Sequence, residues 1–162
     1  METKANCENV TNLHIELFKK ICGEKYVITN EEELGDYSHD QTENLHFMPG
    51  VVLKVRTAEE ISEILKICNK DKIPVTPRGA GTGLSGGSLP NLGGVLIDTS
   101  RMNSIIEIDE NNLQVTTEPG VITETLQESV KEKGLFYPPD PASSGSCFIG
   151  GNISENSGGP KA

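Results

Sequence analysis

The sequence predicts an α+β domain in which a small parallel β-α-β unit is followed by a mostly antiparallel, mixed part. Three observations support this class. Apolar runs at 51–55 and 74–76 flank an amphipathic stretch at 57–70, in the order strand, helix, strand. Short apolar runs separated by turn residues follow from residue 95 onward. Dense glycine tracts interrupt both parts and are the candidate functional loops.

The first part of the chain is expected to be helical. Apolar residues recur at helical spacing from Val10 to Ile21, and Gly23 then gives a stop signal. The apolar side of this helix would carry Val10, Leu13, Leu17, Phe18 and Ile21. His14 falls on the flank of that side, where we expect it to be solvated. Residues 31–37 then indicate a short helical turn, and residues 41–50 a loop.

The parallel unit lies between residues 51 and 76. After the strand at 51–55, Thr57 and Glu60 have the spacing of a capping box, which opens a helix that runs to about Lys70. A second strand follows at 74–76. Two strands joined through a helix in this way are expected to be parallel, with a right-handed crossover.

Short strands and one helix make up the next part. Asp98 and Asp109 each close a strand and are expected to cap the turns that follow, the second of which is Glu110–Asn112. Thr123 is predicted to be the N-cap of a helix that stops at Gly134. The predicted strands are 95–98, 105–109 and 113–117.

The most informative segment is residues 77–87, which read PRGAGTGLSGG. Glycine is costly to order, so a dense run indicates a backbone with unusual dihedrals or a closely approaching ligand. Without Cβ atoms, successive N–H groups can converge on an anion. Apolar strands on both sides indicate an ordered loop rather than a flexible Gly/Ser linker. The segment therefore predicts a phosphate-binding loop.

Two well-known phosphate loops do not fit this segment. Gly81–Gly86 matches G-x-G-x-x-G, but the proline and glycines of residues 87–94 leave no room for the helix that a Rossmann unit opens there. In the P-loop pattern, Gly87 stands where a lysine is required. Two readings stay open for Arg78, which could pair with a phosphate oxygen or brace the loop by donating to backbone carbonyls.

A second tract, residues 143–159, has the same character and reads SSGSCFIGGNISENSGG. Its glycines allow close backbone approach, and its Ser and Asn side chains supply short hydrogen-bonding groups. Two such loops, separated by strands and a helix, indicate a long ligand held from both sides. A dinucleotide with a pyrophosphate in its middle has a suitable size.

Three segments, in this order and spacing, carry a family resemblance. They are Pro77–Gly87, Tyr137–Pro141 (YPPDP) and Gly150–Gly159 (GGNISENSGG). From about Tyr26 to its end, the chain resembles the FAD-binding domain of the vanillyl-alcohol oxidase / p-cresol methylhydroxylase superfamily. Within it, the nearest likeness is to the glycolate oxidase flavoprotein subunit and D-lactate dehydrogenase group. These motifs are specific for the superfamily and less specific for the substrate.

The resemblance implies a set of FAD-binding residues. Arg78–Leu84 would wrap the FAD pyrophosphate through backbone N–H groups, and the second tract would lie near the flavin and its ribityl chain. Non-covalent FAD is implied, because Thr82 stands where members with a covalent flavin often have histidine. Cys147 could in principle anchor a flavin, but its plain reading is a small buried thiol. The implied cofactor-binding residues are Pro77, Arg78, Gly79, Ala80, Gly81, Thr82, Gly83, Leu84, Asp140, Gly145, Ser146, Cys147, Ile149, Gly150, Gly151, Asn152, Asn156, Gly158 and Gly159.

Charge and composition restrict the partners. The formal net charge of −10 disfavours nucleic acid and anionic membrane surfaces. The sequence has no apolar run near the roughly 20 residues of a membrane span, and the polar N-terminus lacks the apolar core of a signal peptide. The four cysteines form no C-x-x-C pair, so we expect no metal site, and free thiols in a cytoplasmic protein.

The implied activity is oxidation of a 2-hydroxy acid, such as glycolate or D-lactate, by hydride transfer to N5 of FAD. Members of the superfamily are longer than this chain. We therefore expect an N-terminal helical segment over 1–45 and an incomplete FAD-binding domain over 46–162, with the substrate-holding cap domain absent. An electron-transfer flavoprotein or an iron–sulfur subunit is a candidate partner, and no residue here is assigned as catalytic base.

Two alternatives of other kinds stay open. The chain could be a truncated product that binds flavin or a partner without turnover. It could also belong to another enzyme of the superfamily, which includes a cell-wall sugar reductase.

Overall fold

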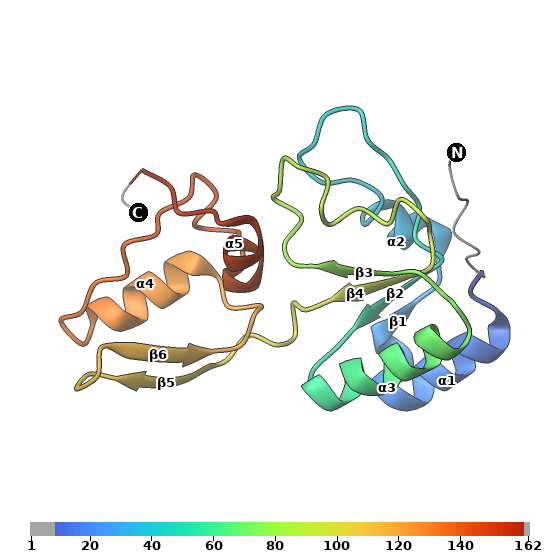
Figure 1. Ribbon diagram of the computed structural model, residues 1–162, viewed down its shortest axis with the longest axis horizontal. Helices are drawn as coiled ribbons and strands as arrows, with labels where there is room; N and C mark the ends of the chain where they lie inside the picture. The colour runs from blue at the N-terminus through green and yellow to red at the C-terminus, as the bar shows by residue number, and fades with distance from the viewer. Residues whose placement is uncertain (1–8, 161–162) are drawn as a thin grey trace.

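The chain folds into two lobes that lie side by side, joined by the segment between the fourth and fifth strands (Figure 1). The structure is a computed structural model and describes residues 9–160. The first lobe contains α1 to α3 and β1 to β4, and the second contains β5, β6, α4 and α5. The elements are α1 (Asn12–Cys22), η1 (Glu24–Tyr26), β1 (Val27–Ile28), α2 (Glu31–Gly35), β2 (Val51–Lys54), α3 (Ala58–Lys70), β3 (Val75–Arg78), β4 (Val95–Asp98), β5 (Ile105–Asp109), β6 (Gln114–Thr117), α4 (Thr123–Lys131) and α5 (Ile149–Glu155).

The first lobe is built on a sheet with the strand order β1-β2-β4-β3. β2, β4 and β3 are parallel, and the short β1 pairs antiparallel with β2. β2 and β4 are almost wholly buried, which explains why they read as continuous apolar runs rather than alternating ones. Helices α1 and α3 pack together, and their buried residues, including Phe18 and Ile64, share one core with the sheet.

The fourth strand lies between β2 and β3, although it follows both in the sequence. The predicted β2-α3-β3 unit is present, and its two strands are parallel to one another through β4 rather than adjacent. Parallel neighbours need a long crossover connection, which is usually a helix. Between β3 and β4 this connection is the glycine-rich segment 79–94, which contains no helix. The loop is therefore fixed at both ends by a buried sheet.

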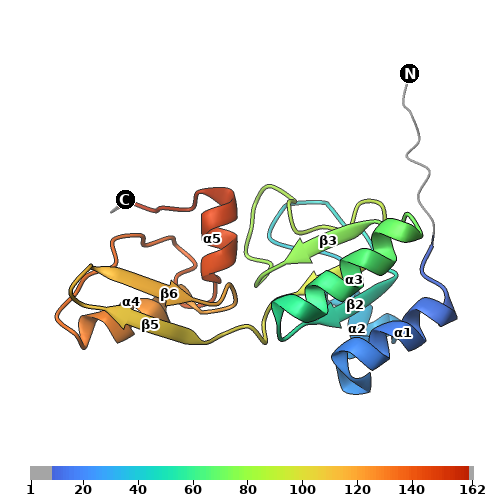
Figure 2. The same cartoon turned by 60° about the horizontal axis from the view of Figure 1, so that its bottom comes forward.

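The second lobe is smaller, with its own core. β5 and β6 form an antiparallel pair with an irregularity between Ile105 and Glu107. One group of buried residues from α4, α5 and the segment before α4 packs with partly buried residues of the hairpin. Figure 2 shows α5 at the inner side of this lobe, facing the loops of the first lobe. The α+β class, with a parallel unit followed by an antiparallel one, is confirmed.

Arg56 and Arg101 fasten the lobes together near the connecting segment. Arg56 Nη1 donates to the carbonyl of Arg101 and to Glu118 Oε2, 3.1 Å away. The same carboxylate accepts from the N–H of Ser104 at 2.7 Å. Arg101 Nη1 donates to the carbonyl of Lys54 at 2.7 Å, and its guanidinium lies 3.3 Å from the ring centroid of Tyr26. The two lobes are thus tied by polar contacts outside the two glycine tracts.

Phe18 of the first helix is buried, and Val10 and Ile21 pack against the core, as the pattern predicts, but the helix differs from it at two positions. His14 is buried, and Leu13 is 69% exposed. His14 is held from two sides, because its Nδ1 accepts from the N–H of Thr11 and its Nε2 lies 3.1 Å from Asp71 Oδ2. The expectation of a solvated His14 is therefore wrong. Polar partners on Thr11 and Asp71 satisfy the ring, which periodicity alone does not reveal.

Three further expectations need correction. Thr123 is the first residue of α4, and Ile122 takes the N-cap position without a side-chain hydrogen bond. The Thr57 side chain caps α3 as predicted, but Glu60 accepts from the N–H of Arg56 rather than from that of Thr57. Part of the second glycine tract, which reads as a loop, forms the helix α5. The two-residue strand β1 was not predicted at all.

The cysteines within the described residues, Cys22, Cys68 and Cys147, are free thiols as expected, and all three are buried. Cys7 lies outside the described part of the chain. Among the described residues, no group of three or more His, Cys, Asp or Glu could hold a metal ion. None of the helices in residues 9–160 has the length and apolar character needed to cross a membrane.

Candidate cofactor-binding site

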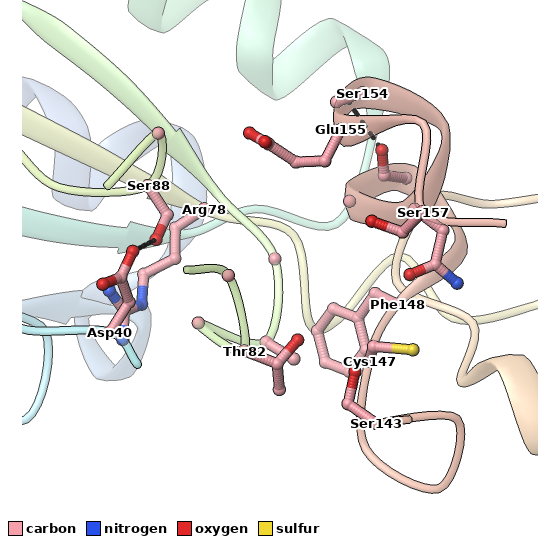
Figure 3. Close-up of a pocket in the computed structure, with 18 of the residues that line it drawn as sticks. Asp40, Arg78, Thr82, Ser88, Ser143, Cys147, Phe148, Ser154, Glu155 and Ser157 are labelled. Carbon is pink, nitrogen blue, oxygen red and sulfur yellow. Dashed lines mark hydrogen bonds between the residues drawn. The ribbon is translucent and has the colours of Figure 1, made fainter. Parts of the chain in front are cut away.

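A cavity of about 340 Å³ lies between the two glycine-rich tracts, where the lobes face one another (Figure 3). Its first wall is the end of β3 and the loop that follows, and its second wall is α5 with the segment before it. Its size falls at the lower end of the roughly 300–1,000 Å³ that small-molecule sites span. The two tracts singled out in the sequence thus line one site.

The first wall presents a run of backbone donors. Within the described residues, none of the N–H groups of residues 80–83 donates a hydrogen bond to another group of the protein. Gly81 has φ +70°, a left-handed conformation that favours glycine. Consecutive unpaired amides around such a residue form a concave cluster that suits an anion.

Arg78 lies beneath this run and is 8% exposed. Its Nη2 donates to the carbonyl of His39 at 2.8 Å, which is the bracing role left open by the sequence. Its Nη1 has no hydrogen-bond partner among the described residues. Burial lowers the pKa of Arg78, an effect opposed by Asp40, Tyr37 and Asp98. The guanidinium thus leaves one buried N–H group without an acceptor, directly behind the loop that carries the unpaired amides.

The last residues of the three parallel strands form a row of charged side chains, positive, negative and positive, next to the glycine-rich loop. Lys54, Asp98 and Arg78 close β2, β4 and β3, and they stand opposite one another in the register. Tyr37 covers this row, with its Oη donating to Asp98 Oδ2 at 3.1 Å and its ring centroid 5.6 Å from the guanidinium carbon of Arg78. Asp98 also caps the next turn as predicted, accepting from the N–H of Ser100. The row fixes Arg78 in place.

Residues 38–47 wrap the outside of the glycine loop. Asp40 is buried, and its carboxylate accepts from the N–H of Thr42 and, at 3.2 Å, from the hydroxyl of Ser88 (Figure 3). The N–H of Gln41 donates to the carbonyl of Gly83. Most of this segment precedes residue 46, the predicted start of the FAD-binding domain. Asp40 lines the cavity all the same.

The second wall depends on a buried hydrogen-bond network. Asn152 Nδ2 on α5 donates to Thr123 Oγ1 at 2.5 Å, and Thr123 Oγ1 lies 3.2 Å from Cys147 Sγ. Thr123 and Cys147 are almost fully buried. The network joins the start of α4, the segment before α5 and α5 itself. Asn152 and Cys147 thus both line the cavity and hold its wall together.

The predicted site residues fall into two groups. Those that line the cavity are Pro77, Arg78, Gly79, Ala80, Gly81, Thr82, Gly83, Cys147, Gly150, Gly151 and Asn152. Those outside its lining are Leu84, Asp140, Gly145, Ser146, Ile149, Asn156, Gly158 and Gly159.

The second group has visible structural roles. Leu84 is 78% exposed, and Ile149 belongs to the core of the second lobe. Asn156 has φ +54° and ends α5 in a left-handed C-cap. At Gly159, a Cβ would lie 2.1 Å from the carbonyl oxygen of Asp140, so only glycine allows this close approach. The N–H of Asp140 in turn donates to the carbonyl of Gly158.

Other lining residues were not predicted. They include Asp40, Ser85, Gly87, Ser88, Thr99, Pro119, Pro141, Ser143, Phe148, Ser154, Glu155 and Ser157. Ser85, Gly87, Ser143, Phe148 and Glu155 stand inside the two tracts, so tract membership could have suggested them. Asp40, Thr99 and Pro119 come from other segments, and only the fold brings them to the site.

The donor set fits a diphosphate. The unpaired amides of residues 80–83 supply a run of donors on this wall, with the buried cation of Arg78 behind them. Backbone amides and a guanidinium are the groups that bind phosphate oxygens in proteins. They do so locally, which reconciles an anion site with a chain of net charge −10.

Comparison with known proteins agrees with this chemistry. A family model described as FAD binding domain matches residues 49–162. The glycolate oxidase subunit GlcD of Bacillus subtilis (strain 168) is 51% identical over 123 residues, covering 76% of this chain and 26% of that protein. A D-lactate dehydrogenase of Anaerostipes hadrus is 39% identical, covering 94% of this chain and 32% of its own. The chain thus spans about a quarter to a third of the length of these relatives.

The fold agrees as well. The solved structure of p-cresol methylhydroxylase with substrate bound superposes with a TM-score of 0.68 at 27% identity, covering 82% of this chain and 27% of that one. The resemblance drawn from the three sequence segments is confirmed, as is FAD as the cofactor of this kind of domain. The chain belongs to the FAD binding domain family.

Proposed function

We propose that this chain holds the FAD of an oxidoreductase that oxidises a small 2-hydroxy acid, such as glycolate or D-lactate. The single observation that carries the proposal is the run of unpaired backbone amides at residues 80–83, which faces a cavity shared with the second tract. The names of the relatives, glycolate oxidase subunit and D-lactate dehydrogenase, support the substrate class. Since the chain spans only part of these relatives, the substrate and activity of a whole protein belong to the proposal.

The residues of the first wall would bind the FAD diphosphate. Amides of residues 80–83 would donate to its oxygens, and the positive charge of Arg78 beneath them would add electrostatic attraction. Arg78 stays in place because His39, Asp98 and Tyr37 surround its guanidinium. When bound, FAD supplies the hydride-accepting N5 of its flavin ring, to which the α-carbon of the hydroxy acid would transfer its hydride.

Attachment of the cofactor would be non-covalent. Thr82 lines the cavity and offers no nucleophile of the kind that histidine provides. The Cys147 thiol is 3% exposed and lies 3.2 Å from Thr123 Oγ1, so that it takes part in the buried network of the second wall. An electron-transfer flavoprotein or an iron–sulfur subunit would receive the electrons from the reduced cofactor.

Titration of the purified chain with FAD tests the first step of this proposal. We expect quenching of flavin fluorescence and a rise in the thermal midpoint that FMN does not match, because FMN lacks the diphosphate. Added potassium chloride should weaken binding only modestly, since backbone amides rather than exposed charges make most contacts.

A matched pair of variants locates the binding. Gly81→Ala should weaken FAD binding at least about tenfold, whereas Gly35→Ala, in α2 and away from the cavity, should leave it unchanged. Gly35 has an open space for a methyl group, with nothing within 4 Å. Equal FAD responses from the wild-type chain and Gly81→Ala, or no response from the wild-type chain, would overturn the proposed site.

A further inference from the structure

One side-chain hydrogen bond crosses the cavity. Ser85 Oγ, at the end of the first glycine run, donates to Glu155 Oε2 at 2.7 Å, on the last residue of α5. Within residues 9–160, no other hydrogen bond joins the segments 79–94 and 143–159. Figure 3 shows the Glu155 side chain extending from α5 toward the first wall.

The glycine at position 87 makes room for this carboxylate. A Cβ on Gly87 would lie 2.6 Å from Glu155 Oε1, closer than such contacts occur in proteins. Ser85, Gly87 and Glu155 all line the cavity. Ser85 and Gly87 thus place the exposed carboxylate of Glu155 against the same loop that carries the unpaired amides of residues 80–83.

The Glu155 carboxylate would attract a hydroxyl group of a ligand and repel a phosphate. The carboxylate oxygens accept hydrogen bonds, and one of them already accepts from Ser85. The other has no donor among the described residues, so a hydroxyl of a ligand could occupy that place. A further phosphate there would meet a like charge.

From this arrangement we propose that Glu155 is a specificity-determining residue, which admits a neutral, hydroxyl-bearing part of the ligand beside the phosphate run and rejects an additional phosphate. The ligand class is a diphosphate flanked by a polyol or a ribose. The inference rests on the proposed function, because it presupposes that the amides of residues 80–83 bind a diphosphate.

Calorimetric titration with ADP and with ATP, without divalent metal ions, tests the inference. The two ligands differ by one phosphate, so the ratio of their dissociation constants isolates the response to that group. In the wild-type chain ADP should bind more tightly than ATP. Glu155→Gln can still accept from Ser85 and removes only the charge, so this ratio should fall by roughly threefold to tenfold.

Two further variants make the test specific. Glu128→Gln removes the same charge from an exposed position on α4 outside the cavity lining, and should leave the ratio unchanged. Ser85→Ala keeps the charge but frees the carboxylate, so the ratio should lie between those of the wild-type chain and Glu155→Gln. An unchanged ratio in Glu155→Gln, or an equal fall in Glu128→Gln, overturns the inference while FAD binding stands. If the wild-type chain binds neither FAD nor ADP, the proposed function is overturned as well.

Discussion

Gly81 lies directly over the guanidinium of Arg78. A Cβ at position 81 would stand 2.4 Å from Arg78 Nη2, the nitrogen that donates to His39. The left-handed φ of Gly81 and this close approach have the same cause, since the loop must bend tightly around a buried cation. The contact between Gly81 and Arg78 therefore fixes both the shape of the glycine loop and the position of the buried positive charge.

Gly81→Ala tests this contact. The methyl group would strain the backbone and displace the guanidinium, so we expect a loss of about 1–3 kcal/mol in the free energy of unfolding. FAD affinity should fall at least about tenfold, because both the amides and Arg78 move. Urea unfolding and FAD titration measure the two effects. With Gly35→Ala as the control, equal behaviour of the two variants would contradict the assigned role.

Tyr37→Phe separates the two contacts of the Tyr37 side chain. The variant keeps the ring beside Arg78 and removes the hydrogen bond to Asp98, a buried carboxylate. We expect a loss of about 1–3 kcal/mol in unfolding free energy, with FAD affinity nearly unchanged. Tyr37→Leu, which also removes the ring, should weaken FAD binding by roughly threefold to tenfold. If Tyr37→Phe weakened binding as much as Tyr37→Leu, the ring would not be the support of Arg78.

Asn152 and Thr123 should show strong energetic coupling. Asn152→Ala or Thr123→Val leaves a buried partner unsatisfied, at a cost of about 1–3 kcal/mol each. The double variant should cost less than the sum of the two, because the second change removes the orphaned group. Urea unfolding of the four proteins gives the coupling energy. Strict additivity would show that the hydrogen bond does not stabilise α5 against α4.

The thiols of Cys22 and Cys68 should be inert in the folded chain and should make stability fall at alkaline pH. Burial is the main cause that raises the pKa of both thiols to about 11, with Glu60 adding to the effect at Cys22 and Asp71 at Cys68. The folded state thus holds protons that the unfolded state releases near pH 9. Their contribution is complete below pH 9 and is lost as the pH rises toward 11.

Thiol labelling and unfolding curves measure these effects. At pH 8, a disulfide reagent should label Cys22 and Cys68 only after denaturation. A variant with alanine at both positions should lose less stability between pH 9 and 11 than the wild-type chain. Rapid labelling of either thiol under native conditions would show that these positions open readily.

Much of the fold follows from sequence patterns, because its elements are local. Strand β4 is apolar up to Asp98, its last residue, and its bounds match the prediction, as do those of β5. His14 and α5 show the limit of such reasoning. His14 is buried by a partner far along the chain, Asp71, and α5 forms from a glycine-rich segment whose Asn152 is fixed by Thr123. Tertiary contacts override weak local preferences at both places.

The site divides in the same way. Gly81 and its neighbours could be found in the sequence, since a dense glycine run has few structural uses. Asp40 and Tyr37 could not, because they come from an unremarkable turn segment that reaches the loop only through the packing of the first lobe. The glycine pattern indicates which loop approaches a ligand. The buried charged residues around that loop can be identified only once the fold has brought their segments together.

The placement of β4 between two earlier strands has a consequence for how the chain acquires its structure. The sheet remains open at its centre until β4 arrives, and the glycine segment is the tether that must close on itself for β4 to insert. Closing a flexible tether costs conformational entropy before any contact is gained. A ligand that binds this tether would therefore stabilise the completed sheet relative to states in which β4 has not inserted.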